Sequence, residues 1–352
     1  MSAGAAPARV CYTALVLRGR IELPRFQSKL LEGNVLGDPS AREVLVYLPP
    51  SYDDTSGEGA RRFPLVMVLP SYAAGHRSFT NYSVWEPDLF ARYEALLARG
   101  EAEEAIFVAP DCMTRWGGSQ FVDSAATGPY QSYLIDEVIP FVDARYRTIP
   151  RRDARAVIGR SSGGFGALRL AIDRPEAFAA YASHAGDAAF EISIRPSFTS
   201  VAITLDRAGG VAPFLARFAE RGPSGAGDFE AIMTIATAAA YAPDQDAPLP
   251  HARLPFDAAA LPIDAVWQRW LAHDPIVRLD RDPEAMKDAA LVFLDAGDRD
   301  EHGLQFAARM LHERLRARGA RVIHEEFPGG HRGTAYRYDR SIPLALQALA
   351  RA

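Results

Sequence analysis

Short apolar segments alternate with longer segments of helical periodicity along most of this chain. The apolar segments are rich in β-branched residues, as buried strands are. They are Glu43–Leu48, Pro64–Leu69, Ala105–Ala109, Arg155–Gly159, Ala180–His184, Leu291–Asp295 and Arg321–Phe327. The helical segments are Tyr130–Arg145, Gly163–Asp173, Gly303–Arg318 and a last one from Ser341. This order predicts an α/β fold with a mostly parallel central sheet and helices on both faces.

The beginning of the chain departs from this alternation. Two strand-like segments, Thr13–Leu23 and Glu43–Leu48, follow one another with no helical pattern between them. Neighbouring parallel strands need a long crossover, whereas antiparallel strands do not. The sheet is therefore expected to begin with antiparallel strands.

A segment from about 190 to 280 also breaks the alternation and is rich in Pro, Ala and Gly. It has helical patches at Val211–Glu220, Phe229–Tyr241 and Ile263–Leu271. Aromatic residues concentrate in it, among them Phe190, Phe198, Phe214, Phe218, Tyr241, Phe256, Trp267 and Trp270. Two interpretations stay open: a helical subdomain that packs its own core, and a lid that also lines a substrate pocket, which would favour an apolar or aryl acyl group. We expect one domain, 1–352, with this insertion.

The composition and net charge of the chain exclude several classes of protein. The chain has 352 residues, of which 48% are hydrophobic and 24% charged, which excludes an intrinsically disordered chain. A net charge of −5 gives no overall basic field for a nucleic acid or an anionic membrane. No apolar run reaches the ~20 residues of a membrane-spanning helix, and no secretory signal is recognised. A cytoplasmic protein is expected. Cys11 and Cys112 are interpreted as buried free thiols, with a disulfide left open.

Residues 156–168 combine an apolar strand, a Gly-x-Ser-x-Gly turn and an amphipathic helix. In this setting the turn is typical of a nucleophile elbow, in which small residues permit a strained conformation at the central serine. That serine is Ser161, which is favoured as the nucleophile over Ser162. A structural glycine-rich turn is the alternative. A nucleotide-binding loop is disfavoured, because the phosphate-binding glycine patterns do not open the helix.

A serine hydroxyl needs a base, and the base needs an acid that orients it. Of the eight histidines, four lie well after Ser161 and near the last predicted strands, namely His302, His312, His324 and His331. His331 is favoured because it lies on a glycine-rich loop after the last predicted strand. By contrast, His302 is expected to serve a helix terminus, His312 to lie on a solvated helix face, and His324 to lie within a strand.

The acid is expected after the penultimate strand, where carboxylates cluster. They are Asp295, Asp298, Asp300 and Glu301. A calcium loop starting at Asp298 is rejected, because its twelfth position is Arg309 where such a loop needs a bidentate Glu. Asp300 and Asp298 both stay open on spacing alone.

With these residues in place, the sequence resembles the esterase D-like family of α/β-hydrolases, also called enterochelin-esterase-like. The resemblance runs from residues 46–52 to the C-terminal helix, and its most specific parts are 124–130, 136–146, 159–166 and 183–187. It implies the α/β-hydrolase fold and hydrolysis of carboxylic esters or thioesters without a metal or organic cofactor. It also implies Asp300 as the acid, because Gly297-x-x-Asp300-Glu301 matches the position at which this family carries it.

The resemblance further implies an oxyanion hole made by two backbone N–H groups, those of Ser162 and Tyr72. Many relatives have His-Gly in the loop after the early strand, whereas this chain has Pro70-Ser71-Tyr72. Because Ser71 replaces the glycine of these relatives, the conformation of this loop can differ from theirs. The backbone N–H of Tyr72 can still act as a donor, since it does not depend on the identity of the side chain.

The expected function is that of a serine carboxylesterase acting on a small-molecule ester, with Ser161 as nucleophile, His331 as base and Asp300 as acid. An acyltransferase with the same triad is the first alternative, and a non-catalytic binding protein with this fold is the second. No nucleic-acid or membrane partner is expected, and a homo-oligomer is left open.

Overall fold

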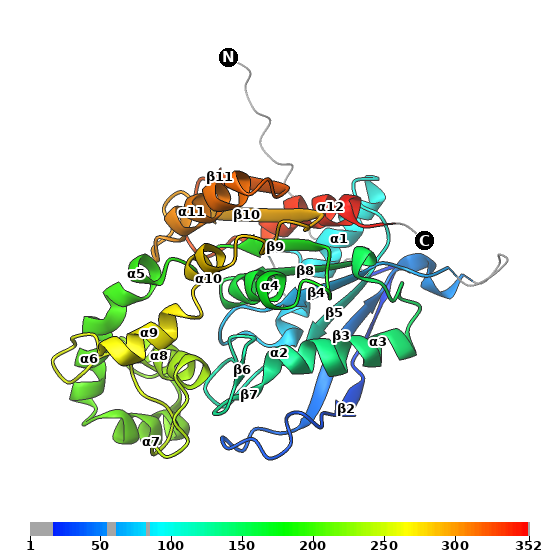
Figure 1. Ribbon diagram of the computed structural model, residues 1–352. Helices are drawn as coiled ribbons and strands as arrows, with labels where there is room; N and C mark the ends of the chain where they lie inside the picture. The colour runs from blue at the N-terminus through cyan, green and yellow to red at the C-terminus, as the bar shows by residue number, and fades with distance from the viewer. Residues whose placement is uncertain (1–16, 55–60, 82–84, 351–352) are drawn as a thin grey trace.

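The computed structural model of the protein describes residues 17–54, 61–81 and 85–350. At its centre lies a nine-stranded sheet with the order β1-β3-β5-β4-β8-β9-β10-β11, in which β2 also pairs with β3 (Figure 1). Its strands are β1 (Arg20–Glu22), β2 (Arg25–Gln27), β3 (Ala41–Leu48), β4 (Leu65–Leu69), β5 (Ile106–Pro110), β8 (Arg155–Arg160), β9 (Ala180–His184), β10 (Leu291–Gly297) and β11 (Val322–Phe327). A small separate hairpin consists of β6 (Asp123–Ser124) and β7 (Gly128–Pro129).

The strand directions confirm the predicted sheet. β3 is antiparallel to β1, β2 and β5, whereas every pair from β5–β4 through β10–β11 is parallel. Of the predicted first strand, Thr13–Leu23, residues 13–16 lie outside the described residues, and β1 covers only Arg20–Glu22.

Helices of different lengths flank the sheet. They are α1 (Leu89–Ala98), α2 (Tyr130–Ser132), α3 (Ile139–Arg145), α4 (Ser162–Asp173), α10 (Pro275–Arg281), α11 (Leu304–Ala317) and α12 (Tyr338–Ala348). A π-helical segment, η3 (Tyr133–Val138), joins α2 to α3, so the predicted helix at 130–145 is continuous but underwound in its middle. The last helix begins at Tyr338, one turn before the predicted start.

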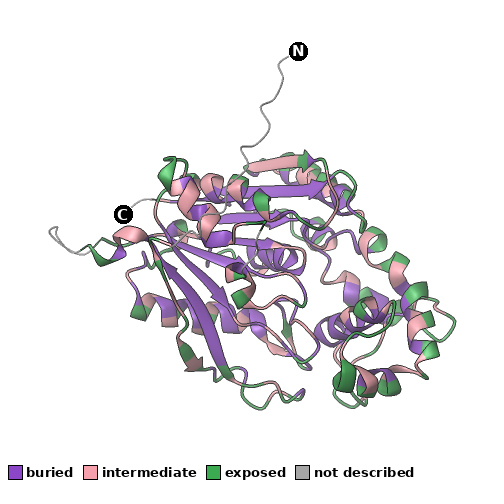
Figure 2. Ribbon diagram, turned by 180° about the vertical axis from the view of Figure 1, so that it is seen from behind, coloured by how far each residue is buried: buried purple, intermediate pink, exposed green. Residues whose placement is uncertain are grey.

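Alternate residues of β4 show that helices cover both faces of the sheet. Leu65, Met67 and Leu69 pack into a core shared with α3, α4, α10 and α11. Val66 and Val68 pack into a second core with α1 and α12. Figure 2 shows the central strands buried throughout. Strands that are covered on both faces have continuous apolar sequences, which is why the short apolar segments of the sequence located them.

The insertion between β9 and β10 forms a helical lid beside the sheet (Figure 1). The lid consists of α5 (Phe190–Ser193), α6 (Phe198–Arg207), α7 (Val211–Arg221), α8 (Asp228–Tyr241) and α9 (Asp264–Leu271). It has a core of its own, in which Phe198, Phe214 and Trp267 are buried together with Phe165 of α4. After the lid, α10 packs back onto α4 and α11. The predicted subdomain core is therefore present.

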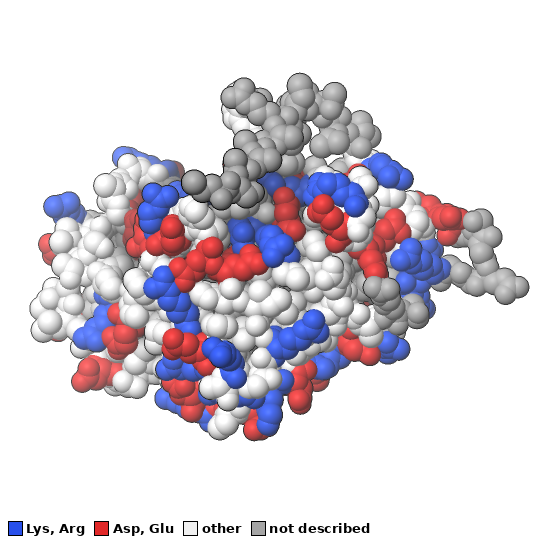
Figure 3. Space-filling view, turned by 90° about the horizontal axis from the view of Figure 1, so that it is seen from above, with Lys and Arg blue, Asp and Glu red and all other residues white. Residues whose placement is uncertain are grey.

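Charge is dispersed over the surface. On the face seen in Figure 3, basic and acidic side chains are interspersed. No helix among the described residues is long and apolar enough to span a membrane. Cys112 is a buried free thiol, and burial raises its pKa well above the ordinary value. Cys11 lies outside the described residues.

Candidate functional site

Ser161 occupies a sharp turn between β8 and α4. Its backbone has φ 56° and ψ −123°, a conformation that L-residues rarely adopt. A Cβ at Gly159 would lie 2.1 Å from the carbonyl oxygen of Gly163, so the turn closes only because this position has no side chain. The N–H of Ser161 donates to the carbonyl of His184, at 2.8 Å, which ties the turn to the end of β9. The strand, turn and helix predicted around Ser161 are thus confirmed.

His331 lies within hydrogen-bonding distance of Ser161. Its Nε2 is 3.0 Å from the Ser161 Oγ, and its Nδ1 is 2.8 Å from the Asp300 Oδ2. The N–H of His331 donates to the Glu301 carboxylate at 2.8 Å, which holds the loop after β11 against the turn after β10. The structure therefore brings Ser161, His331 and Asp300 together, although they are far apart in the sequence.

The geometry also decides between Asp300 and Asp298 as the partner of His331, a choice that spacing alone left open. The side chain of Asp300 is fully buried and accepts a second hydrogen bond from the N–H of His302, at 2.9 Å. Asp298 instead accepts from the N–H of Gly329, at 3.0 Å. Asp298 therefore stabilises the loop that carries His331 and does not contact the imidazole.

Two opposing effects act on the pKa of Asp300. Burial acts to raise it, but the hydrogen bond and the charge of His331 and the N–H of His302 outweigh burial. The pKa of Asp300 is consequently held below its ordinary value. An ionised carboxylate at this position fixes the imidazole with Nδ1 protonated, so that Nε2 faces Ser161 as an acceptor.

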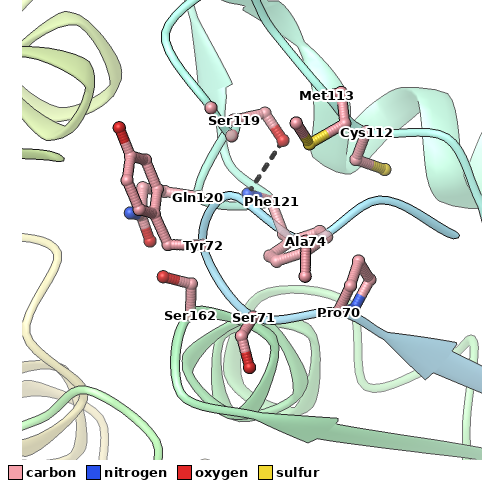
Figure 4. Close-up of a pocket in the computed structure, with 12 residues that line it drawn as sticks. Pro70, Ser71, Tyr72, Ala74, Cys112, Met113, Ser119, Gln120, Phe121 and Ser162 are labelled. Carbon is pink, nitrogen blue, oxygen red and sulfur yellow. Dashed lines mark hydrogen bonds between the residues drawn. The ribbon is translucent and has the colours of Figure 1, made fainter. Parts of the chain in front are cut away.

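The two predicted oxyanion donors lie beside Ser161. Ser162 is the first residue of α4, and Tyr72 lies in the loop after β4; both line one small pocket (Figure 4). Among the described residues, no acceptor is found for the backbone N–H of either one. The N-terminus of α4 adds a favourable dipole for a negative charge at this point.

The conformation of the loop that contains Tyr72 does not require a glycine in place of Ser71. The φ of Ser71 is not positive, and its hydroxyl instead donates to the carbonyl of Arg160, at 3.2 Å. The left-handed residue is Ala73, whose N–H donates to the Gly117 carbonyl at 2.8 Å. The hydroxyl of Tyr72 donates to the Trp116 carbonyl. The Tyr72 side chain therefore anchors the loop.

Two clefts meet at Ser161 and His331. The first, of about 700 Å³ including space open to solvent, lies under the lid. Its wall includes Gln120, Asp187 and His302 from outside the lid helices, and Glu230, Met233, Thr234, Thr237, Tyr241 and Trp270 from the lid. The second, of about 1270 Å³, lies between the Tyr72 loop and the loop after His331, and Phe229, Arg160 and Arg332 contribute to it.

The helices of the insertion therefore line the cleft at Ser161 as well as packing into a core of buried aromatic residues. His302 lies just before the N-terminus of α11, as the sequence analysis expected, and it also borders the site. Its ring packs edge-on against His331, with centroids 4.8 Å apart, and it borders both clefts. Gln120, Asp187 and Glu230 were not predicted either, because they come from separate segments that no local pattern links.

A second Ser–His–Asp group lies inside the molecule. The Nδ1 of His184 is 2.7 Å from the Asp295 Oδ1, and its Nε2 is 2.8 Å from the Ser341 Oγ. The Asp295 Oδ2 accepts from the Nε of Arg337 at 2.7 Å. Sequence analysis missed this group because its histidine precedes the expected order and lies within a strand.

Comparison with known proteins identifies the family. The model of the family described as "Putative esterase" matches residues 38–341. This chain belongs to that esterase family. Membership confirms the predicted family resemblance. Among curated proteins, an esterase of Mycobacterium tuberculosis is 40% identical over 67 residues, which is 18% of this chain and 15% of that protein. The chain thus matches only a small part of that relative's length.

Solved structures of the same fold confirm the α/β-hydrolase architecture. A ferulic acid esterase has a TM-score of 0.61 at 16% identity and covers 95% of this chain and 100% of its own. The S-formylglutathione hydrolase from Agrobacterium tumefaciens has a TM-score of 0.58 at 15% identity, with 95% and 97% covered. A ferulic acid esterase from Anaeromyces mucronatus has a TM-score of 0.56 at 15% identity, with 98% and 97% covered.

Proposed function

We propose that this chain is a serine esterase that hydrolyses carboxylic esters through Ser161, His331 and Asp300. One observation carries the proposal: Ser161, held on a strained turn, lies 3.0 Å from an imidazole whose other nitrogen lies 2.8 Å from a buried carboxylate. The two clefts that meet at Ser161 offer separate space for the acyl and alcohol parts of an ester.

In the first half of the proposed reaction, the Oγ of Ser161 attacks the ester carbonyl carbon. The Nε2 of His331 takes the hydroxyl proton and then delivers it to the departing alcohol. Asp300 keeps the imidazole in the required tautomer and stabilises the imidazolium that forms. An acyl group is left on Ser161.

The carbonyl oxygen becomes negatively charged in this step. The N–H groups of Ser162 and Tyr72 are the proposed donors to it, and they are fixed before the substrate binds. One such donor is worth about 3–4 kcal/mol of transition-state stabilisation in comparable enzymes. In the second half, His331 activates a water that releases the acid and restores Ser161.

Pre-steady-state kinetics with 4-nitrophenyl acetate test the acyl-enzyme. We expect a burst of 4-nitrophenolate close to one equivalent per active protein, followed by a slower steady rate, if deacylation limits turnover. Where acylation limits turnover, the acetyl-enzyme does not accumulate, and the test is then Ser161→Ala, which should lose the ester turnover of the wild type. Turnover by Ser161→Ala at the wild-type rate would overturn the proposal.

A further inference from the structure

The two clefts that meet at Ser161 differ in the charge of their walls. Asp187 and Glu230 line the cleft under the lid, and none of the described residues that line it is Lys or Arg. The more open cleft is lined by Arg160 and Arg332, and Glu230 is the only carboxylate among the described residues of that lining. An ester that extends into both clefts therefore meets carboxyl groups on one side of Ser161 and guanidinium groups on the other.

Arg160 is the last residue of β8, directly before the nucleophile, and its side chain is half-buried. Its Nε lies 3.3 Å from the Ser71 Oγ, and its Nη1 lies 3.2 Å from the Thr334 Oγ1. Both partners are neutral hydroxyls. Among the described residues, no carboxylate forms an ion pair with this guanidinium, and no hydrogen bond is found for its Nη2. A positive charge that is held by neutral groups at the wall of a cleft favours an anionic ligand.

Arg332 supplies a second positive charge, from the loop after β11. It follows His331 directly in the chain and is exposed, and within the part of the chain that the structure describes no ion pair is found for it. By contrast, Arg337 and Arg340, a few residues later, are both paired with Glu325. The guanidinium groups at the cleft are thus available to a ligand. A guanidinium binds a carboxylate or a phosphate through two parallel hydrogen bonds.

We propose that the open cleft binds the alcohol part of the ester, and that this alcohol carries an anionic group, a carboxylate or a phosphate, which Arg160 and Arg332 bind. This inference rests on the proposed esterase function and names the class of its leaving group. The alcohol is assigned to this cleft because exposed residues such as Phe229 and Gly333 border it, so that a product can depart. The acyl part then occupies the cleft under the lid, whose carboxyl groups disfavour an anionic acyl group.

Aryl acetates that share the acetyl group and differ in the charge of the leaving phenol test the proposal. The series consists of 3-acetoxybenzoate, 3-acetoxybenzamide and 3-acetoxyphenyltrimethylammonium, and 3-acetoxyphenyl phosphate adds the second anion. Release of the phenol is followed by ultraviolet absorbance, and each kcat/KM is divided by the rate constant of hydroxide-catalysed hydrolysis. We expect the benzoate to exceed the benzamide by about tenfold and the ammonium ester to be the poorest substrate. High salt should reduce this preference. The stronger of the two anionic preferences distinguishes a carboxylate from a phosphate.

A second pair of esters tests which cleft binds the anion. Monophenyl succinate and phenyl butyrate have the same leaving group, but the first carries its charge on the acyl side. We expect the succinate ester to be the poorer substrate by about threefold or more, because its charge faces the carboxyl groups under the lid. A preference for the succinate ester would reverse the assignment of the two clefts and overturn the proposal.

Substitutions locate the preference for an anionic leaving group. Arg332→Gln and Arg160→Gln should each lower the benzoate-to-benzamide ratio by about three- to tenfold, whereas Glu230→Gln should raise it. Arg316 of α11 is exposed and lines neither cleft, so Arg316→Gln changes the net charge equally and should keep the wild-type ratio. Thr334→Val removes a hydrogen-bond partner of Arg160 but not its charge, and should also keep the ratio. This variant separates the charge of Arg160 from its contact with the loop.

The outcomes are distinguishable. If none of the acetates reacts faster than with Ser161→Ala, the esterase proposal fails and this inference fails with it. If the acetates are hydrolysed but the benzamide or the ammonium ester equals or exceeds both anionic esters, only the inference on the leaving group is overturned. A preference for anions that persists unchanged in both Arg332→Gln and Arg160→Gln would also overturn it, because these residues would not bind the anion.

Discussion

Two Ser–His–Asp groups lie in this molecule with almost the same hydrogen-bond lengths. In one, His331 lies 3.0 Å from Ser161 and 2.8 Å from Asp300. In the other, His184 lies 2.8 Å from Ser341 and 2.7 Å from Asp295. Yet Ser161 borders two clefts, whereas Ser341 is 0% exposed inside α12.

The surroundings of the two serines differ in every respect that matters for acyl transfer. Ser161 has a strained backbone, a helix N-terminus behind it and two backbone donors nearby. Ser341 lies in the interior of a helix, without a positive φ. The carboxylate of the buried group is also bound to Arg337, which neutralises it inside the core.

This difference teaches that hydrogen-bond distances alone do not define a catalytic triad. Access for the substrate and donors for the oxyanion distinguish the two groups. The buried group joins β9, β10 and α12, and the carbonyl of His184 accepts from the N–H of Ser161. We therefore infer that the buried group is structural and supports the turn on which the nucleophile lies.

The largest expected effect separates the two serines. Ser161→Ala should lower kcat/KM for 4-nitrophenyl acetate by about 10⁴- to 10⁶-fold, because it removes the nucleophile. Ser341→Ala should leave kcat/KM within about threefold and reduce the free energy of unfolding by about 1–3 kcal/mol, because the Nε2 of His184 loses its buried partner. Steady-state kinetics and urea unfolding of both variants measure this. Loss of turnover in well-folded Ser341→Ala would break the distinction.

Substitutions of the two carboxylates near His331 have the next largest expected effect on turnover. Asp300→Asn should lower kcat by about 10³- to 10⁴-fold, because the imidazole no longer keeps the required tautomer. Asp298→Asn is the matched control two residues away, and it should cost less than about tenfold, since Asp298 contacts the N–H of Gly329 and the side chain of Arg299 and not the imidazole. The opposite ranking in kinetic assays would assign the acid to Asp298.

In the buried group of Ser341, His184 and Asp295, the corresponding substitution is expected to lower the stability of the fold. Asp295→Asn leaves Arg337 without one of its two carboxylate partners, the other being Glu325. We expect the free energy of unfolding to fall by about 3–5 kcal/mol, because a buried charge loses its compensation. Urea unfolding monitored by circular dichroism measures the change. An unchanged urea midpoint would show that the contact between Asp295 and Arg337 contributes little to the stability of the fold.

The smallest effect concerns pH. Asp300 has a pKa below its ordinary value of 3.8 in the folded state, so the unfolded chain binds this proton more tightly. Its contribution to stability is therefore complete above about pH 5 and decreases as the pH falls through the folded-state pKa. The stability difference between wild type and Asp300→Asn should shrink on going from pH 6 to pH 3 in urea unfolding. A difference that grows in acid would contradict the pKa direction.

Sequence alone predicted a mostly parallel sheet with an antiparallel beginning, and it singled out Ser161 and His331, which the structure brings together. Buried strands form continuous apolar runs, and the elbow has a local sequence pattern with a steric reason behind it. The choice of Asp300 over Asp298 needed the resemblance to a family, and the geometry now gives its physical reason: only Asp300 reaches the imidazole.

The substrate cavity could not be predicted in the same way. Gln120 lies in a loop of left-handed residues, Asp187 follows β9, and Glu230 belongs to the lid. Their proximity depends on how the lid packs on the body, which no local pattern encodes. Sequence also does not reveal that both faces of Tyr241 are covered inside the protein, by Phe190 and His273.

Labelling with a fluorophosphonate tests the central claim most directly, because the reagent reacts only with an activated and accessible serine. Intact-protein mass spectrometry should show one adduct on the wild type and on Ser341→Ala, and peptide mapping should place it on Ser161. Ser161→Ala should remain unlabelled. An adduct on Ser341, or undiminished labelling of Ser161→Ala, would contradict the account.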